Sequence, residues 1–238
     1  MKKTITLNER EVEYELVRKK VKNINLRIRP DCSVGVSVNS AVSAENIDGF
    51  LLSKATVIIT ALDKYAEIIK YSSPSYSYTT GESFRYLGKE LRLKVAEGKK
   101  NVTADGVYLY LTLPNTNDTE AKAKLIEKWF DNECRELFPV LIENTHNIFR
   151  KYDVKLPKLI LRDMATRWGS CQTKRGIITL NKRLIETPRE CIEYVIMHEF
   201  THFIQPNHSR KFYDLLAVFM PDWKARKATL EKYMFYAM

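Results

Sequence analysis

The sequence predicts an α+β protein in which a β-rich N-terminal half precedes a more helical C-terminal half. The first supporting observation is alternation, since apolar residues occupy every second position in segments such as 107–113. The second is a change of period after the polar segment 114–118, beyond which apolar residues recur at helical spacing. We therefore expect a β-rich region with an inserted helix at 1–115 and a second region at 116–238.

The elements of the N-terminal half follow from the same patterns. Alternation and turn residues predict strands at 11–17, 23–29, 34–38 and 107–113, and a hairpin at 84–95. A meander is the simplest arrangement of the first three strands. Ser43 is a suitable N-cap for a helix, because apolar residues recur at about helical spacing from Ile47 to Tyr65. No internal repeat is visible in the sequence.

The C-terminal half is expected to begin with a long helix, followed by strands at 155–164 and 176–181. The next helix has a clear predicted start. Thr187 is suited to the N-cap, Pro188 to the first helical position, and Glu190 lies three residues after the cap. This pattern predicts a capping box, in which the threonine and glutamate side chains each accept a hydrogen bond from a free backbone amide.

The composition is that of a globular protein, with 45% hydrophobic and 29% charged residues among 238. The N-terminus lacks the apolar core of a signal peptide, and no segment is long enough to cross a bilayer. We therefore expect a cytoplasmic protein without a membrane partner. The four cysteines are scattered and form no C-x-x-C pair, which favours reduced thiols over disulfides or a zinc ribbon.

The chain carries 39 basic and 29 acidic side chains, which leave a formal charge of +10. This excess would attract anionic partners such as nucleic acid, nucleotides or acidic peptides. The basic residues are dispersed, however, and do not form the clustered stripe that is typical of a nucleic-acid-binding surface. A solvated basic surface is the simpler interpretation.

Three of the four histidines lie in the short segment 195–213, on and just after the capped helix. His198 and His202 are four residues apart, so a helix would project both from one face toward a single metal ion. Glu199 is displaced by about 100° from His198, which places it beside the metal rather than among the ligands. This is the geometry of H-E-x-x-H zinc hydrolases, in which the glutamate handles protons.

A third ligand is predicted at His208. Gln205 and Pro206 should end or bend the helix, because proline disfavours a helical residue before it and has no backbone donor. The turn that follows can fold His208 back toward the first two histidines. Three neutral imidazoles would leave the fourth tetrahedral position of a zinc ion open, as a catalytic site requires.

The ligand set has alternatives. Three other side chains could chemically replace the third histidine: Asp214, Asp222 and Cys171. His146 is isolated in the preceding helix and is more typical of a surface or hydrogen-bonded core histidine. The histidine spacing matches the metzincin pattern H-E-x-x-H-x-x-G-x-x-H, but Gln205 stands where that pattern has glycine.

Candidate substrate-binding residues lie before the metal motif. Arg167 could stabilise an oxyanion or hold a carboxylate or phosphate. Trp168 could form a wall of the cleft, or it could anchor a turn that Gly169 makes possible. Asn181, the last residue of the 176–181 strand, is a further candidate.

In combination, RWGSC at 167–171, GIITLN at 176–181 and the segment 193–213 closely resemble the YgjP-like family of zinc-dependent metallohydrolases. The likeness extends from about Pro157 to Leu230. It implies a minimal zincin-like catalytic half, with an active-site helix packed on a small sheet.

The resemblance also implies roles for individual residues. It implies three zinc ligands and a general base: His198, His202, His208 and Glu199. Two departures from the family pattern, Phe200 in place of leucine and Tyr213 in place of tryptophan, affect no implied ligand. Related minimal zincins include proteases that act on DNA-bound proteins, and some family members are described as UTP pyrophosphatases.

We therefore expect a zinc-dependent metallopeptidase with one Zn²⁺ per chain, which cleaves amide bonds of a peptide or protein with zinc-activated water. In zincins a strand beside the active-site helix commonly pairs with extended substrate, and 176–181 is our candidate. One alternative is a nucleotide (UTP) pyrophosphatase that uses the same metal site, although no second ligand cluster is visible. The other is a nucleic-acid-binding protein with structural zinc, which would require a closed site.

Overall fold

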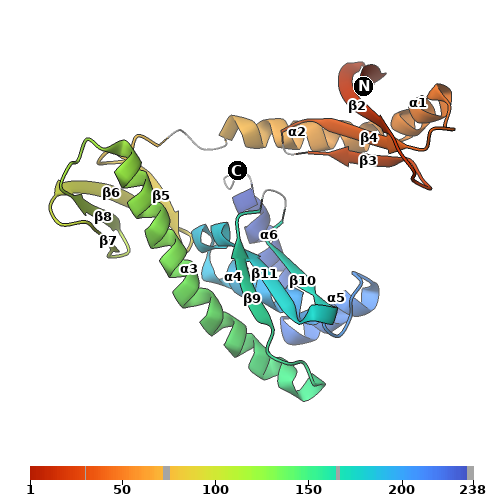
Figure 1. Ribbon diagram of the computed structural model, residues 1–238. Helices are drawn as coiled ribbons and strands as arrows, with labels where there is room; N and C mark the ends of the chain where they lie inside the picture. Colours follow the sequence, from red (N-terminus) through yellow and green to blue (C-terminus); the bar gives the residue numbers. More distant parts are fainter. Residues whose placement is uncertain (30, 72–75, 165–166, 235–238) are drawn as a thin grey trace. The chain divides into compact units, whose positions relative to one another are not determined.

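The computed structural model describes residues 1–29, 31–71, 76–164 and 167–234 (Figure 1). Runs of strands alternate with runs of helices, which confirms the α+β fold class. The contacts divide the chain into two compact units, with the boundary between residues 73 and 74. Within the described ranges, no helix is both long and apolar enough to span a membrane.

The first unit contains a four-stranded sheet and two helices within residues 1–71. Its elements are β1 (Lys2–Leu7), β2 (Arg10–Arg18), β3 (Asn25–Ile28), β4 (Val34–Val38), α1 (Ala44–Ser53) and α2 (Ala55–Tyr71). The strand order is β1-β2-β4-β3, with β2 and β4 parallel and the outer pairs antiparallel. The predicted meander is therefore wrong. β4 takes a central position because Val34, Val36 and Val38 are almost fully buried, while the short β3 forms an edge.

The helix expected after Ser43 is divided into α1 and α2, because the chain leaves the helical conformation at Lys54. The predicted N-cap is confirmed, since the Ser43 hydroxyl oxygen accepts a hydrogen bond from the backbone amide of Asn46 at 3.2 Å. The helices contribute five buried apolar side chains to the core of this unit: Ile47, Leu51, Ala55, Ile58 and Leu62.

The second unit contains two sheets and four helices, among them the longest helix of the described residues. The first sheet, of order β5-β6-β8-β7, consists of β5 (Ser83–Tyr86), β6 (Lys89–Glu97), β7 (Asn101–Ala104) and β8 (Tyr108–Leu113). The second, of order β10-β11-β9, consists of β9 (Lys158–Arg162), β10 (Gly169–Gln172) and β11 (Ile177–Asn181). The helices are α3 (Thr119–Phe149), α4 (Arg189–Thr201), α5 (Arg210–Phe219) and α6 (Trp223–Met234), and the 3₁₀ turns are η1 (Arg150–Tyr152), η2 (Thr173–Arg175) and η3 (Lys182–Glu186).

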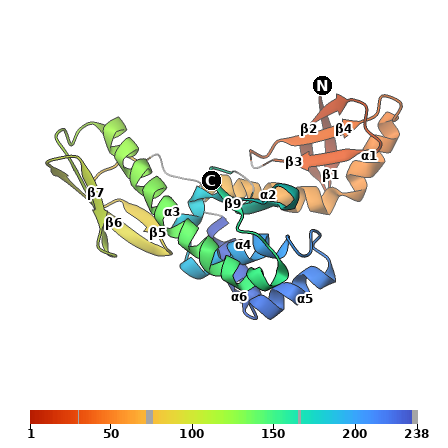
Figure 2. The same cartoon turned by 60° about the horizontal axis from the view of Figure 1, so that its bottom comes forward.

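Helix α3 links the two parts of this unit (Figures 1 and 2). Its N-terminal part packs on the β5–β8 sheet, where Ile126 joins the core of that sheet. Its C-terminal part packs against α4, with Phe138 and Phe149 fully buried in a second core. One helix therefore belongs to both cores and ties the first sheet to the helix that carries the histidine motif.

The two four-stranded sheets have the same topology, which shows an internal repeat that we did not find in the sequence. Each starts with a hairpin whose two-residue turn, 8–9 or 87–88, has positive φ at both residues. Each then has a parallel central pair flanked by antiparallel strands. A helix follows, and its N-cap, Ser43 or Asp118, lies five residues after the last strand. We call this arrangement the ββββα module.

The unit boundary differs from the one expected at residue 115, because the second ββββα module is attached to the histidine-bearing helix. The backbone amides of Leu87 and Gly88 donate hydrogen bonds to the carbonyl oxygens of Ile185 (2.8 Å) and Glu186 (3.2 Å). A Cβ atom on Gly88 would lie only 2.7 Å from Cγ of Pro188. The β5–β6 turn therefore lies directly on η3 and the start of α4.

The start of α4 also differs in detail from the prediction, because no capping box forms. α4 begins at Arg189 with Pro188 in the N-cap position and no side-chain cap. The Thr187 hydroxyl instead donates a hydrogen bond to the carbonyl oxygen of Leu184 at 2.8 Å. The threonine is thus used to close η3 rather than to cap the helix.

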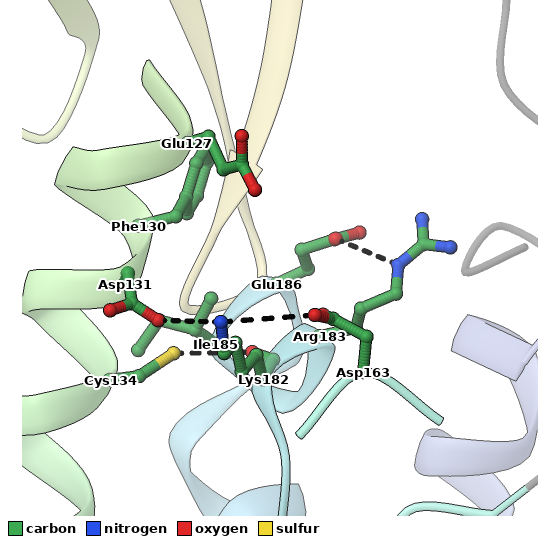
Figure 3. Close-up of a pocket in the computed structure, with 9 residues that line it drawn as sticks. All are labelled: Glu127, Phe130, Asp131, Cys134, Asp163, Lys182, Arg183, Ile185 and Glu186. Carbon is green, nitrogen blue, oxygen red and sulfur yellow. Dashed lines mark hydrogen bonds and ion pairs between the residues drawn. The ribbon is translucent and has the colours of Figure 1, made fainter. Parts of the chain in front are cut away.

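A cavity of about 160 Å³ between α3 and η3 is crossed by ion pairs (Figure 3). The ammonium nitrogen of Lys182 lies 2.8 Å from a carboxylate oxygen of Asp131 on α3 and 3.8 Å from one of Asp163. Arg183 pairs with Glu186 at 3.2 Å. The Lys182–Asp131 pair holds η3 on α3 and so helps to fix the position from which α4 starts, whereas the Arg183–Glu186 pair lies within η3.

Gly88→Ala should destabilise the second unit more than Gly106→Ala does. Both glycines have positive φ, so alanine costs about 1–2 kcal/mol of backbone strain at each. Only at Gly88 would the new methyl group also overlap Pro188, which adds about 1–3 kcal/mol. The measurement is urea unfolding followed by tryptophan fluorescence, since all three tryptophans lie in this unit. Equal losses in the two variants would contradict the tight contact.

Candidate metal centre

The site is built on α4, a helix that is buried on most of its surface. It packs against α3, α5, α6 and β10. The helix ends at Thr201, whose hydroxyl donates a hydrogen bond to the carbonyl oxygen of Met197 at 2.8 Å, and His202 occupies the C-cap. As predicted, the helix ends before Gln205 and Pro206. The motif residues therefore stand on a rigid scaffold at the point where the chain turns away.

The structure brings the three predicted histidine ligands together. One potential ligand atom from each of His198, His202 and His208 lies within 4.8 Å of the other two. The Nε2 atoms of His198 and His208 are 2.9 Å apart. Nδ1 of His202 faces the carbonyl oxygen of Gln205 at 3.3 Å, which places the proton on Nδ1 and leaves Nε2 as an acceptor.

Phe212 packs against all three imidazoles. Its side chain is fully buried, and its ring centroid lies 4.9, 4.7 and 4.9 Å from the centroids of His198, His202 and His208. The phenylalanine is held by the first turn of α5, where its backbone amide donates a hydrogen bond to the carbonyl oxygen of Ser209 at 3.0 Å. We did not predict this role from the sequence, although an aromatic residue four positions after His208 was a usable signal.

The donor set fits a zinc ion. Burial, followed by the neighbouring His202 and His208, lowers the pKa of His198 to about 3, so this ring stays neutral and keeps a lone pair available. Burial also lowers the pKa of His202, with a further contribution from His208. Nitrogen acceptors of neutral rings repel one another at short range unless a cation or proton lies between them. Three converging neutral imidazoles are the donors of known catalytic zinc sites.

Glu199 lies next to the histidines and is 6% exposed. Burial raises its pKa to about 8, and the charge of Arg167 opposes this shift. Strand β10 passes so close that a Cβ atom on Gly169 would lie 2.7 Å from Oε1 of Glu199 and 2.9 Å from Cγ1 of Val195. Residue 169 must therefore be glycine for the carboxylate to occupy this position.

Similarity to a known protein family shows to which family the chain belongs. The family model described as the YgjP-like metallopeptidase domain matches residues 22–233. The chain belongs to the YgjP-like family. This match confirms the resemblance seen in the sequence. Because the family is described as a metallopeptidase domain, the match also supports the expectation that the protein is a hydrolase.

Among solved structures, this YgjP-like protein is similar to the crystal structure of the metallopeptidase zymogen of Pyrococcus abyssi abylysin. The sequence identity is 21% and the TM-score 0.38, and the match covers 43% of this chain and 99% of that chain. No curated protein sequence matches the chain.

The three candidate substrate-binding residues of the YgjP-like protein, Asn181, Arg167 and Trp168, lie in different environments. Asn181 is buried, and its amide donates hydrogen bonds to the carbonyl oxygens of Met164 (2.7 Å) and Arg167 (3.1 Å). Its side-chain oxygen accepts a hydrogen bond from the backbone amide of Arg183 at 3.2 Å. These bonds favour a role in positioning the exposed Arg167 over direct contact with a substrate. Trp168 is half-buried and lines a cavity that also reaches Glu199.

The alternative third ligands lie outside the histidine cluster. Asp214 forms an ion pair with Arg210 at 3.8 Å, and Asp222 forms one with Arg226 at 2.9 Å. Burial, with a smaller contribution from Glu199, raises the pKa of Cys171 to about 12, which disfavours the thiolate that zinc would need.

His146 is also accounted for. It is buried, and its Nε2 atom lies 2.9 Å from the carbonyl oxygen of Val154. It is thus a hydrogen-bonded core histidine, which was one of the two interpretations that the sequence allowed.

The strand proposed to pair with substrate, 176–181, cannot do so. β11 (Ile177–Asn181) is the central strand of its sheet, paired with β10 on one side and β9 on the other, and all its residues are buried. Within the described part of the chain, β10 is the edge strand that contacts Glu199, through Gly169. The β-prone residues of this run identified a strand correctly but carried no information on its neighbours.

Gly169→Ala should lower the free energy of unfolding of the second unit by about 1–3 kcal/mol, because the added methyl group must displace Glu199 or Val195. Gly98→Ala is the matched control, since a Cβ atom there would make an ordinary 3.5 Å contact with Thr112. Urea unfolding followed by tryptophan fluorescence measures both. A Gly169→Ala protein as stable as the control would show that β10 and α4 are farther apart than described.

Proposed function

We propose that this protein is a zinc-dependent metallopeptidase that cleaves amide bonds in peptides or proteins. One Zn²⁺ per chain is held by His198, His202 and His208, and Glu199 is the general base. The observation that carries the proposal is the convergence of three imidazoles beside a buried carboxylate. The family match to a metallopeptidase domain supports the same reaction class.

The chemistry follows from the positions of the side chains. Zinc in this site supplies Lewis-acid activation of water and of the scissile carbonyl group. Glu199, in its ionised form, would accept the proton of the attacking water and return it to the leaving nitrogen. Arg167, which Asn181 holds through its backbone, offers a guanidinium group that stabilises negative charge on the substrate.

The peptide is proposed to bind along β10. An edge strand has unpaired backbone groups, and an extended chain that pairs with them gains hydrogen bonds without a sequence requirement. β10 is such an edge, and Gly169 places it against Glu199. A substrate bound there would pass the general base.

No specific observation favours either of the two alternative functions. Among the described residues, the three histidines are the only group that could hold a metal ion, whereas phosphoanhydride hydrolysis often uses paired metals or carboxylate-held magnesium. A purely structural zinc site has no use for a buried glutamate next to its ligands. The family match likewise gives no support for a nucleotide or nucleic-acid partner.

Zinc content tests the ligand set. Wild-type protein should contain about one zinc per chain by elemental mass spectrometry. His208→Ala should lose affinity by more than the roughly 10–100-fold that removal of an outer partner of a metal site costs. Asp214→Ala is the control and should keep its zinc, because Asp214 is exposed and lies outside the cluster. Undiminished zinc in His208→Ala, or wild-type protein that stays empty after reconstitution, would reject the proposed ligand set.

Glu199→Gln tests the reaction. The variant should retain zinc, because no ligand is changed, and should lose casein cleavage by about 10²- to 10⁴-fold, the usual contribution of a general base. Hydrolysis of UTP that is lost in the same variant, with peptides untouched, would instead favour the pyrophosphatase. Nucleic-acid binding with steep salt dependence and no turnover that depends on Glu199 would favour a structural zinc.

A further inference from the structure

A cavity of about 210 Å³ opens beside the histidine cluster, between α4, α6 and the start of β10. Glu199 and His198 line it from α4. The volume is below the roughly 300–1,000 Å³ of sites for drug-sized ligands. It therefore suits one side chain of a larger molecule rather than a complete small-molecule ligand.

The walls of this cavity are apolar. Tyr194 and Val195 contribute from α4, Leu230 from α6, and Trp168 from the segment before β10. The first three side chains are buried, at 6%, 4% and 4% exposure. An apolar side chain that enters loses contact with water and gains contact with these walls.

The rim of the cavity carries both signs of charge. Lys227 and Glu231, one turn apart on α6, form an ion pair at 3.7 Å and line the opening. Both side chains are about half exposed. Because they pair with each other, the opening attracts neither acidic nor basic side chains strongly. The apolar walls therefore determine which substrate side chains bind in the cavity.

We propose that this cavity is a specificity pocket, which holds a large apolar side chain of the substrate residue next to the cleaved bond. The inference rests on the proposed peptidase function, because it assigns the pocket to the same site. A substrate chain paired with β10 passes Glu199, and the cavity opens beside this carboxylate and Gly169. Leu230 closes the pocket from α6 and determines which side chains fit.

Cleavage-site mapping tests the pocket. Zinc-loaded protein is incubated with a peptide library, and the products are sequenced by mass spectrometry. We expect leucine, isoleucine, methionine or phenylalanine to be enriched at one position flanking the cleaved bond. Leu230→Trp should fill the pocket. The ratio of kcat/KM for a substrate with leucine at this position to kcat/KM for the same substrate with alanine should then fall at least tenfold. Leu230→Met should keep the preference, and Val218→Trp, which adds the same ring at an exposed site on α5, should leave it unchanged.

A binding measurement separates the pocket from the reaction. The zinc-free full-length chain is titrated with N-acetyl-leucinamide and, as a control, N-acetyl-glycinamide, and the indole N–H signal of Trp168 is followed by NMR. Saturable shifts with leucinamide but not with glycinamide, which disappear in Leu230→Trp, support the pocket. If the same protein cleaves no peptide, the peptidase proposal is rejected while the pocket is kept. Peptide cleavage with a flat residue preference and no leucinamide binding overturns the pocket and leaves the peptidase intact. A Leu230→Trp protein that binds leucinamide like wild type also overturns it.

Discussion

The close approach of β10 to α4 at Gly169 is the constraint on which the rest of the site depends. The absence of a side chain lets a strand backbone lie against the carboxylate of Glu199, which buries this group. β10 is also an edge strand of its sheet. The burial of the proposed base therefore depends on the same strand along which we propose that the peptide binds.

The histidine cluster depends in turn on an aromatic side chain that bears no ligand. Phe212 touches all three imidazoles, and its position on the first turn of α5 joins the helix motif to the loop that carries His208. A metal site of this kind needs ligands that are oriented before the metal arrives, because a loose cluster would lose rotational entropy on binding. Packing on a rigid ring provides this orientation without adding a competing donor.

The sequence predicted the parts of the site that are local. His198, Glu199 and His202 follow from the period of a single helix, and His208 from the proline that ends it. The fold class and most elements were also predictable, because alternation and helical spacing are local signals. Strand order, the pairing of β11 on both sides, and the contact between Gly169 and Glu199 join segments that are distant in the chain, and no pattern within one segment encodes them. The capping box failed because the helix starts one residue later than expected, with Pro188 rather than Thr187 in the N-cap position.

The two copies of the ββββα module differ in how their first turns are packed. In the second copy, the turn at 87–88 is enclosed by η3 and α4, so its glycine is tied to the catalytic helix. In the first copy, the turn at 8–9 is exposed and consists of asparagine and glutamate, and the core of that unit is formed by its own residues. The turn of one module is thus fixed against the helix that carries the histidines, whereas the turn of the other is exposed, so its sequence can change without a steric conflict.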